Sequence, residues 1–210
     1  MPDTKVLKIN PVSPEKGKIG DAVSVLLKGG IVAFPTETVY GLAALYDDPA
    51  SMERLRAVKS REAGKPFTVH IAKTDMIEAL GCEIDFMSGK LIKRFWPGPL
   101  TVILKFRDTD GTLGFRMPEC EIARRLIDSC ARPIVAPSAN QAGQKSPRTA
   151  QEVFKALNGR IDLILDGGPT KMGRDSTVIN ATELPVRILR EGAIPAALIK
   201  DAWHESGETV

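Results

Sequence analysis

The sequence is poor in the side chains from which metal centres and disulfide frameworks are built. Its 210 residues include two histidines and three cysteines, and the cysteines, Cys82, Cys120 and Cys130, show no CxxC spacing. We therefore expect neither a disulfide framework nor a zinc cluster. With His70 and His204 as the only imidazoles, a histidine-based metal centre is not expected either, and we assign no metal-ligating residue.

Several common motifs and segment types are also missing. The sequence has no GxxxxGK[ST] and no GxGxxG, so any nucleotide would have to be held without a P-loop or a Rossmann fingerprint. It has no GxSxG nucleophile elbow either. No run approaches the roughly 18 apolar residues that a membrane span requires, and the first ten residues lack the apolar core of a signal peptide. We therefore expect a cytoplasmic protein with no membrane partner.

The overall charge does not identify a partner, but its distribution is informative. The 29 basic and 26 acidic residues give a net charge of +3, which is too small to indicate a nucleic-acid-binding protein. Lysine and arginine gather in three segments that also contain glycine, serine or proline, at 59–65, 144–148 and 171–174. Any one of them would be typical of a solvated face, whereas the three together indicate a positively charged patch.

Short apolar runs alternate with helical patterns along the chain, without repeats or a linker. Strands are expected at 6–9, 31–34, 67–71, 100–106, 112–117, 134–136, 161–165, 176–180 and 186–189. Helices are expected at 13–29, 48–58, 74–80, 85–95, 119–130, 150–157 and 194–203. The alternation predicts one α/β domain over residues 1–210, with a twisted mixed sheet flanked by helices, a core over roughly 9–203 and a short C-terminal tail.

The segment 31–44, with the sequence IVAFPTETVYGLAA, is the first candidate for a functional site. Its apolar start is typical of a strand covered on both faces, and Pro35 is expected to end that strand because it cannot donate to the ladder. The polar side chains of Thr36, Glu37, Thr38 and Tyr40 would then lie at the strand's end, before Gly41 allows the chain to turn. Ligands bind at strand ends in α/β sheets, although an ordinary polar loop is the alternative.

A second strand end repeats this design. The apolar strand expected at 134–136 stops at Pro137 and is followed by Ser138 and Asn140. Both segments therefore carry hydroxyl or amide groups directly after a short buried strand. The two strand ends could face one pocket.

The other polar side chains suit the binding of phosphates and a carboxylate rather than nucleophilic attack. Phosphate contacts are expected from Lys59, Arg61 and Lys65, hydrogen bonds from Ser138, Asn140 and Ser146, and a carboxylate or phosphate contact from Arg116 or Arg190. For Arg116 a surface ion pair is the alternative. The residues alone thus predict a pocket for an anionic ligand, and nucleotidyl transfer needs little more than positioning and charge stabilisation.

Seven motifs stand in an order that is typical of one family. They are PTETVYGL at 35–42, KSREAGKPFTVH at 59–70, FWPGPLT at 95–101, FRMP at 115–118, APSAN at 136–140, DST at 175–177 and LREG at 189–192. The match spans nearly the whole chain. The sequence resembles the YrdC/TsaC family of threonylcarbamoyl-AMP synthases, in its short single-domain form.

The resemblance implies a nucleotidyltransferase that converts ATP, L-threonine and bicarbonate into threonylcarbamoyl-AMP and pyrophosphate, with Mg²⁺ accompanying ATP. A separate tRNA threonylcarbamoyl transferase would then use the product to build N6-threonylcarbamoyladenosine in tRNA. The family fold is a twisted α/β sheet with a concave, positively charged surface. This fold agrees with the alternation of strands and helices described above.

The resemblance also assigns residues by motif. Threonine contacts are implied for Thr36, His70, Arg116, Ser176 and the backbone of Ala136. ATP contacts are implied for Arg61, Lys65, Thr112, Ser138, Asn140, Ser146 and Arg190. Lys59 and Arg61 are the expected catalytic cations, because the carbamate on threonine is itself the nucleophile and two anions must be held close together.

Two other functions remain open. A non-catalytic protein of the same fold could bind tRNA or double-stranded RNA on the basic face, and its affinity would then fall steeply with salt. A relative that makes a carbamoyl-adenylate from carbamoyl phosphate is less favoured, because such relatives usually carry extra domains.

Overall fold

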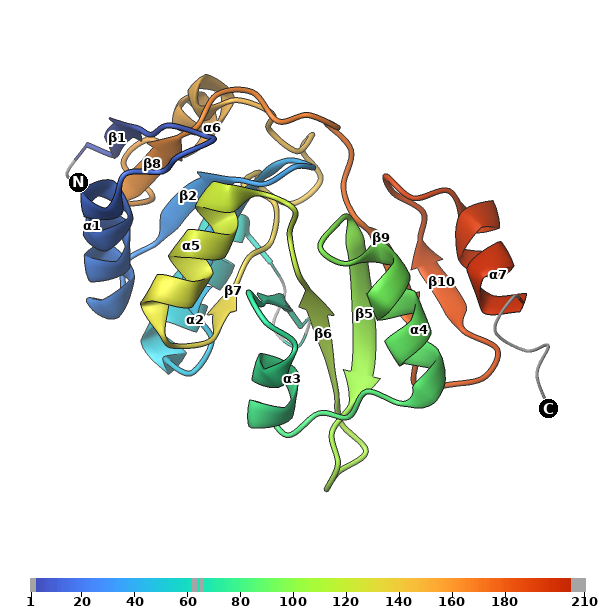
Figure 1. Cartoon of the computed structure of the whole chain (residues 1–210). Helices are drawn as coiled ribbons and strands as arrows, with labels where there is room; N and C mark the ends of the chain where they lie inside the picture. The colour runs from blue at the N-terminus through green and yellow to red at the C-terminus, as the bar shows by residue number, and fades with distance from the viewer. Residues whose placement is uncertain (1–2, 62–63, 65, 205–210) are drawn as a thin grey trace.

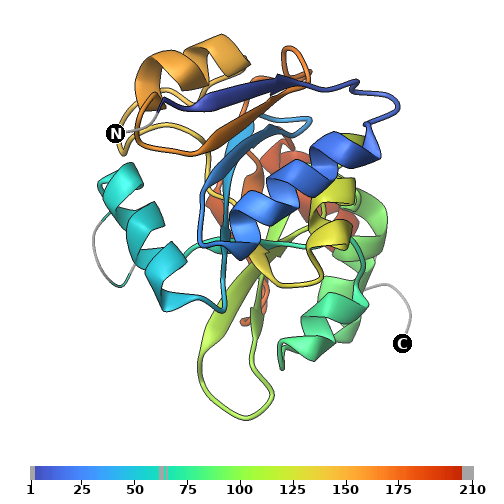
Figure 2. The same cartoon turned by 90° about the vertical axis from the view of Figure 1, so that its left-hand side faces the viewer.

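The computed structural model describes residues 3–61, 64 and 66–204 of the chain. Lys65, one of the expected phosphate contacts, and the expected C-terminal tail lie outside the described residues. Figure 1 shows how a single β-sheet runs through the molecule, with helices packed against it. In Figures 1 and 2 the strands at the two ends of the sheet run in different directions, so the sheet is strongly twisted.

The described residues form a ten-stranded sheet in the order β1-β8-β2-β3-β7-β4-β6-β5-β9-β10. The strands are β1 (Lys5–Lys8), β2 (Val32–Pro35), β3 (Tyr40–Leu45), β4 (Thr68–His70), β5 (Leu100–Lys105), β6 (Thr112–Arg116), β7 (Ile134–Val135), β8 (Leu163–Asp166), β9 (Thr177–Asn180) and β10 (Arg187–Arg190). β8 runs parallel to both β1 and β2, β4 is parallel to β6 and β5 to β9, whereas the other neighbouring pairs are antiparallel. The expected α/β class with a mixed sheet is confirmed.

The described residues form seven helices, which pack against the sheet and against one another. They are α1 (Lys16–Leu27), α2 (Pro49–Lys59), α3 (Asp75–Ala79), α4 (Phe86–Phe95), α5 (Glu121–Cys130), α6 (Ala150–Leu157) and α7 (Ala196–His204). α1 and α5 lie side by side (Figures 1 and 2), and Leu26 and Leu126 pack there with Phe34 in one buried cluster. Ala33 joins a second cluster with α2 and α6 on the opposite face, so β2 is buried on both sides. No helix in the described part is long and apolar enough to cross a membrane.

The segment after β2 differs from the sequence prediction. We expected a turn at Gly41, but Gly41 lies inside β3 and pairs with Phe34 in an antiparallel hairpin with β2. The signal was weak because Tyr40–Leu45, YGLAAL, is rich in alanine and glycine, which have low strand propensity. All six residues of this strand are buried, and burial here overrides propensity.

The start of α1 also differs from the prediction. Ser13 and Pro14 were expected to begin the helix, but it begins at Lys16. The side chain of Asn10 accepts hydrogen bonds from the backbone N–H groups of Val12 and Ser13. These bonds hold Val12 and Ser13 in a local turn before the helix, and Glu15 becomes its N-cap.

Backbone hydrogen bonds join β3 to the loop after β7. Tyr40 N donates to Pro147 O at 2.9 Å, Leu42 N donates to Pro137 O at 2.8 Å, and Ala139 N donates to Tyr40 O at 2.8 Å. The two segments that the sequence predicted to face one pocket are therefore direct neighbours. Their relative position is set by the main chain and not by flexible side chains.

Gly192, two residues beyond the end of β10, provides a test of how tightly the neighbouring loop is packed. A Cβ atom at this position would lie 2.2 Å from Asp175 O and 2.4 Å from Ser176 C, whereas one at Gly20 in α1 would meet nothing within 4 Å. Gly192→Ala should lower the free energy of unfolding by about 1–3 kcal/mol, because backbone atoms cannot move aside easily. Gly20→Ala should raise it by up to about 1 kcal/mol through helix propensity. Urea unfolding measures both, and a Gly192→Ala protein as stable as the parent would contradict the packing described here.

Candidate functional site

A cavity of about 270 Å³ lies over one face of the C-terminal half of the sheet. Every second residue of β4, β5 and β6 lines it, because alternate side chains of a strand share one face. The sequence predicted a site at strand ends. The structure instead gives it a floor made of the sheet face and walls made of the segments after β2, α2 and β7 and the segment before β9, with Arg190 at the end of β10.

The cavity brings together most of the residues singled out from the sequence. Its lining includes Thr36, Lys59, Arg61, His70, Thr112, Arg116, Ala136, Ser138, Ser176 and Arg190. Asn140 and Ser146 do not line it, and instead border a separate pocket beside α6. Lys65 lies outside the described residues.

Lys59 is buried at the C-terminal end of α2, with all three ammonium protons engaged. Its Nζ donates to Ser138 O at 2.6 Å, to Asn140 O at 2.5 Å and to Asn140 Oδ1 at 3.1 Å. Burial, reinforced by the charge of Arg61, lowers the pKa of Lys59 to about 8, and the charge of Asp175 opposes this shift. Lys59 therefore anchors the loop after β7. Its catalytic role stays a prediction.

The two predicted residues outside the cavity also hold neighbours in place. Asn140 Oδ1 accepts hydrogen bonds from Lys59 and from Ser138 Oγ, the latter at 2.5 Å. Ser146 Oγ lies 3.0 Å from Asp175 Oδ1 and 3.2 Å from Asp175 Oδ2 and donates to this carboxylate. Both side chains thus contact residues that do line the cavity, and their predicted contact with ATP stays a prediction.

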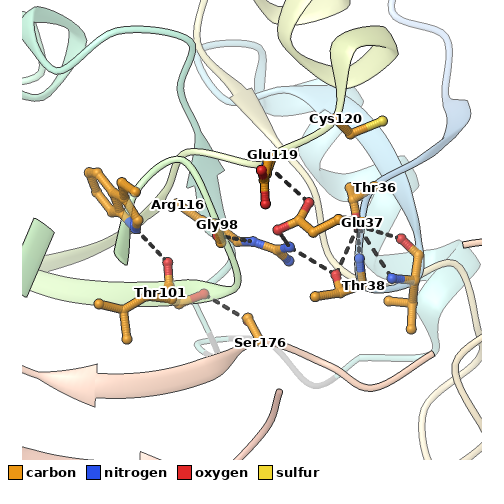
Figure 3. Close-up of polar contacts among 12 residues, drawn as sticks. Thr36, Glu37, Thr38, Gly98, Thr101, Arg116, Glu119, Cys120 and Ser176 are labelled. Carbon is orange, nitrogen blue, oxygen red and sulfur yellow. Dashed lines mark hydrogen bonds and ion pairs between the residues drawn. The ribbon is translucent and has the colours of Figure 1, made fainter. Parts of the chain in front are cut away.

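Arg116 forms an ion pair with Glu37 at the base of the cavity (Figure 3). Nη2 donates to Glu37 Oε1 at 2.7 Å and to Thr38 Oγ1 at 2.9 Å, and Nε donates to Gly98 O at 3.3 Å. Glu37 Oε2 accepts from the backbone N–H of Glu119. The side chains of the pair are only 6% and 2% exposed, so the alternative of a surface ion pair is wrong. Among the guanidinium nitrogens, Nη1 is the one with no partner in the described part of the chain. A ligand could therefore accept a hydrogen bond from Nη1 but not a bidentate pair of hydrogen bonds from two free nitrogens.

A chain of hydroxyls continues from this pair into the turn after β2 (Figure 3). Thr36 Oγ1 donates to Val39 O at 2.7 Å, so Thr38 is the donor in the 2.8 Å contact between the two threonine hydroxyls. Thr38 Oγ1 in turn accepts from Arg116. The Thr36 hydroxyl therefore donates its proton within the turn and also accepts from Thr38 Oγ1 and from the backbone N–H groups of Thr38 and Val39, so Thr36 offers a ligand van der Waals contact.

Arg61 and Arg190 add positive charge to the more exposed part of the cavity. The Arg61 guanidinium lies 4.9 Å from the centroid of the Phe67 ring, and its Nε is buried without a partner in the described structure. Burial, together with the charges of Arg190 and Arg56, lowers the pKa of Arg61. Arg190 donates two hydrogen bonds to Ser176 O, at 3.1 and 2.9 Å. These guanidinium groups are close together without a paired carboxylate among the described residues, which favours an anionic ligand.

His70 is a neutral polar group on the cavity floor. Burial, reinforced by the charge of Arg116, lowers the pKa of His70 to about 3, so the imidazole is uncharged at neutral pH. Its Nδ1 is buried and has no hydrogen-bond partner in the described structure. A buried polar atom without a partner is costly, and a ligand in the cavity could satisfy it.

Comparisons with known proteins agree with this arrangement. Residues 24–192 match the family model of Sua5, YciO and YrdC proteins, which carries the description "Telomere recombination". The chain belongs to the Sua5/YciO/YrdC family. A curated Pyrococcus abyssi member, named threonylcarbamoyl-AMP synthase, is 44% identical over 91% of this chain and 58% of its own length. A Bacillus subtilis member of the same name is 41% identical over 87% of this chain and 56% of its own length. The chain thus spans little more than half the length of these two relatives.

Solved structures of the Sua5/YciO/YrdC family share the fold. The crystal structure of P. abyssi Sua5 complexed with L-threonine superposes with a TM-score of 0.89 and 40% sequence identity, covering 95% of this chain and 61% of the other. Escherichia coli YciO superposes with a TM-score of 0.81 and 26% identity, covering 90% and 96%. The motifs that the sequence shares with the family are therefore carried on the same backbone framework.

Two residues of this Sua5/YciO/YrdC site were missed as site residues in the sequence. Glu37 stands in the PTETVYGL motif, but its partner Arg116 is 79 residues away and no local pattern reveals the pairing. Asp175 lines the cavity and accepts hydrogen bonds from Ser146. The signal that could have found Asp175 is its place in the DST motif, directly before Ser176.

Removing the charge of Glu37 should destabilise the fold strongly. Glu37→Gln leaves the buried Arg116 charge without its counter-ion, and the loss should be about 3–5 kcal/mol in the free energy of unfolding. Urea unfolding measures it, with Glu53→Gln on the exposed side of α2 as a near-neutral control. The double variant Glu37→Gln/Arg116→Met should recover part of the loss, because no buried charge then remains. A Glu37→Gln protein as stable as the control would contradict the buried pair.

His70 should make the protein less stable in mild acid. The pKa is about 3 in the folded state and about 6.5 in the unfolded state, so between these values the unfolded chain binds more protons and stability falls as the pH falls. From about pH 7 to about pH 5 this contribution is about 2 kcal/mol. His70→Gln should lack it, and its free energy of unfolding should fall less over the same interval. Equal pH dependence in the two proteins would mean that His70 does not stay neutral in the fold.

Proposed function

We propose that this chain is a threonylcarbamoyl-AMP synthase that acts on ATP, L-threonine and bicarbonate. The observation that carries the proposal is the division of one cavity into two sides, a buried side with Arg116 and neutral His70 and an open side with Arg61 and Arg190. Such a cavity suits a small zwitterion beside a polyphosphate. Support also comes from the relatives that carry this name and from the relative solved with L-threonine.

On the buried side the ligand would be L-threonine. Its carboxylate would accept from Arg116 Nη1, the guanidinium nitrogen that the pair with Glu37 leaves available. His70 Nδ1 would satisfy its missing hydrogen bond with threonine, and Ser176 and the backbone of Ala136 would border the same ligand. Because Glu37 offsets the charge of Arg116, this side suits a molecule with no net charge better than a free dianion.

On the open side the ligand would be ATP. Arg61 and Arg190 would contact phosphate oxygens, Ser138 and Thr112 would border the nucleotide, and the charge of Lys59 would add to the field. Bicarbonate would form a carbamate on the threonine amine with loss of water, and a carbamate oxygen would attack the α-phosphorus with departure of pyrophosphate. The cations lower the repulsion between the carbamate and the phosphates, which is the largest obstacle to this step.

Mg²⁺ is part of the proposal, because with ATP bound it would neutralise phosphate charge during nucleotidyl transfer. The product would pass to a tRNA threonylcarbamoyl transferase for N6-threonylcarbamoyladenosine formation, and we expect both proteins to act in the cytoplasm. Binding of tRNA or double-stranded RNA on a basic face stays an untested alternative. It would reveal itself as RNA affinity that falls steeply with salt.

The test is release of pyrophosphate from ATP with bicarbonate and each amino acid in turn. Release should require L-threonine, and Arg190→Ala should weaken ATP binding by about ten- to a hundred-fold through loss of a charged hydrogen bond. Arg187→Ala is the matched control, because Arg187 lies on the same strand, pairs with Glu183 and does not line the cavity. If the correctly folded protein releases no pyrophosphate that depends on threonine, the proposed function is wrong. If Arg190→Ala and Arg187→Ala lose ATP affinity equally, Arg190 does not contact the phosphates.

A further inference from the structure

Asp175 stands out because it is an acidic side chain in a cavity suited to anions. Among the described residues that line the cavity it is the one carboxylate, beside Lys59, Arg61, Arg116 and Arg190. The other acid nearby, Glu37, is paired behind Arg116 and does not line the cavity. A carboxylate beside the phosphates of ATP would repel them unless a cation lies between.

The backbone holds Asp175 rigidly at this place. Its carbonyl accepts a hydrogen bond from Ala193 N at 2.8 Å, and Gly192 packs so closely that no side chain fits between the two loops. Arg190 clamps the next residue, Ser176, through its carbonyl and its hydroxyl. The carboxylate therefore cannot withdraw from the cavity by a movement of its own loop.

The side chain of Asp175 is directed toward Ser146 in the loop after β7, and its charge acts on Lys59. Ser176 Oγ contacts Thr101 Oγ1 at 2.9 Å on the floor of the cavity, as Figure 3 shows. Asp175, its neighbour in the chain, instead receives the hydroxyl of Ser146, and its charge acts on Lys59. Successive side chains of an extended segment face opposite ways, which explains the division.

No Lys, Arg or His side chain of the described residues forms an ion pair with Asp175, although several cations line the same cavity. Both carboxylate oxygens lie within 3.2 Å of one hydroxyl, which supplies a single proton. Most of the acceptor capacity of the carboxylate is thus still available. A carboxylate in this condition is a suitable ligand for a hard cation.

The donor set decides which cation fits. The described residues contain no group of three or more His, Cys, Asp or Glu side chains that could hold a metal by themselves. Mg²⁺ is commonly bound through one or two carboxylates, water and the phosphates of a substrate. We propose that Asp175 is the protein ligand of the Mg²⁺ that accompanies ATP, with Ser146 orienting its carboxylate. This inference rests on the proposed function, because the phosphates of ATP supply the other ligands.

The experiment measures ATP affinity by calorimetry in EDTA and in Mg²⁺, for the parent and for Asp175→Asn. In the parent, Mg²⁺ should strengthen ATP binding. In EDTA, Asp175→Asn should bind ATP at least as tightly as the parent, because it lacks one negative charge. In Mg²⁺, it should not show the increase in ATP affinity that the parent shows. An Asp175→Asn protein that keeps the full gain would overturn the proposal. Thermal unfolding of each variant checks that the fold is intact.

Glu191→Gln is the matched control, because it removes one exposed negative charge close in sequence and should keep the gain from Mg²⁺. Ser146→Ala should reduce the gain by about ten-fold or more, as expected for a group that orients a metal ligand. Mn²⁺ in place of Mg²⁺ gives a second readout, since the electron paramagnetic resonance spectrum of Mn²⁺-ATP on the parent should differ from that on Asp175→Asn. Identical spectra would also overturn the assignment.

The outcomes for the parent separate this inference from the proposed function. If the parent binds no ATP with or without Mg²⁺, the proposed function itself fails. If it binds ATP equally well in EDTA and Mg²⁺ and still releases pyrophosphate with threonine, the function stands and the role of Asp175 is wrong.

Discussion

The ion pair between Glu37 and Arg116 is the contact on which the geometry of the site depends. Each charge loses its hydration when buried, so the pair persists only because both partners and their remaining donors and acceptors are satisfied. Three strands, β3, β7 and β4, lie between β2 and β6 in the sheet. In a flat sheet these two strands would be about 19 Å apart. The 2.7 Å contact therefore depends on the twist of the sheet, on the turn that carries Glu37 beyond the end of β2, and on the length of the Arg116 side chain.

Much of the fold follows from patterns that are local in the sequence. β2 and β7 are short apolar runs that end at a proline, and α2 begins where Asp48 and Pro49 provide a cap. β3 could not be predicted in the same way, because its alanines and glycine carry no strand signal and its place depends on burial between β2 and β7. The start of α1 depends on one side chain, that of Asn10, whose preference for its own turn outweighs the helix signal at Ser13.

The site was predictable as a set of residues but not as an arrangement. Motif order selected Arg116 and Ser138, and both line the cavity. The sequence could not show that Asn140 accepts from Lys59 or that Ser146 donates to Asp175, because these contacts join residues 81 and 29 positions apart. Nor could it show that most donors of Arg116 are already used. Long-range contacts, more than residue types, determine which atoms a ligand can reach.

The anchoring of Lys59 has a thermodynamic consequence for the loop after β7. Every proton of its ammonium group is hydrogen-bonded to the 138–140 segment. An anion that binds the Lys59 ammonium directly must therefore replace at least one of these hydrogen bonds. Any such ligand therefore changes the conformational freedom of a loop that is also hydrogen-bonded to β3. Occupancy of the cavity and the order of this loop are linked equilibria. A change that orders the loop therefore alters ligand affinity by the same factor by which the ligand alters the equilibrium between the loop's conformations.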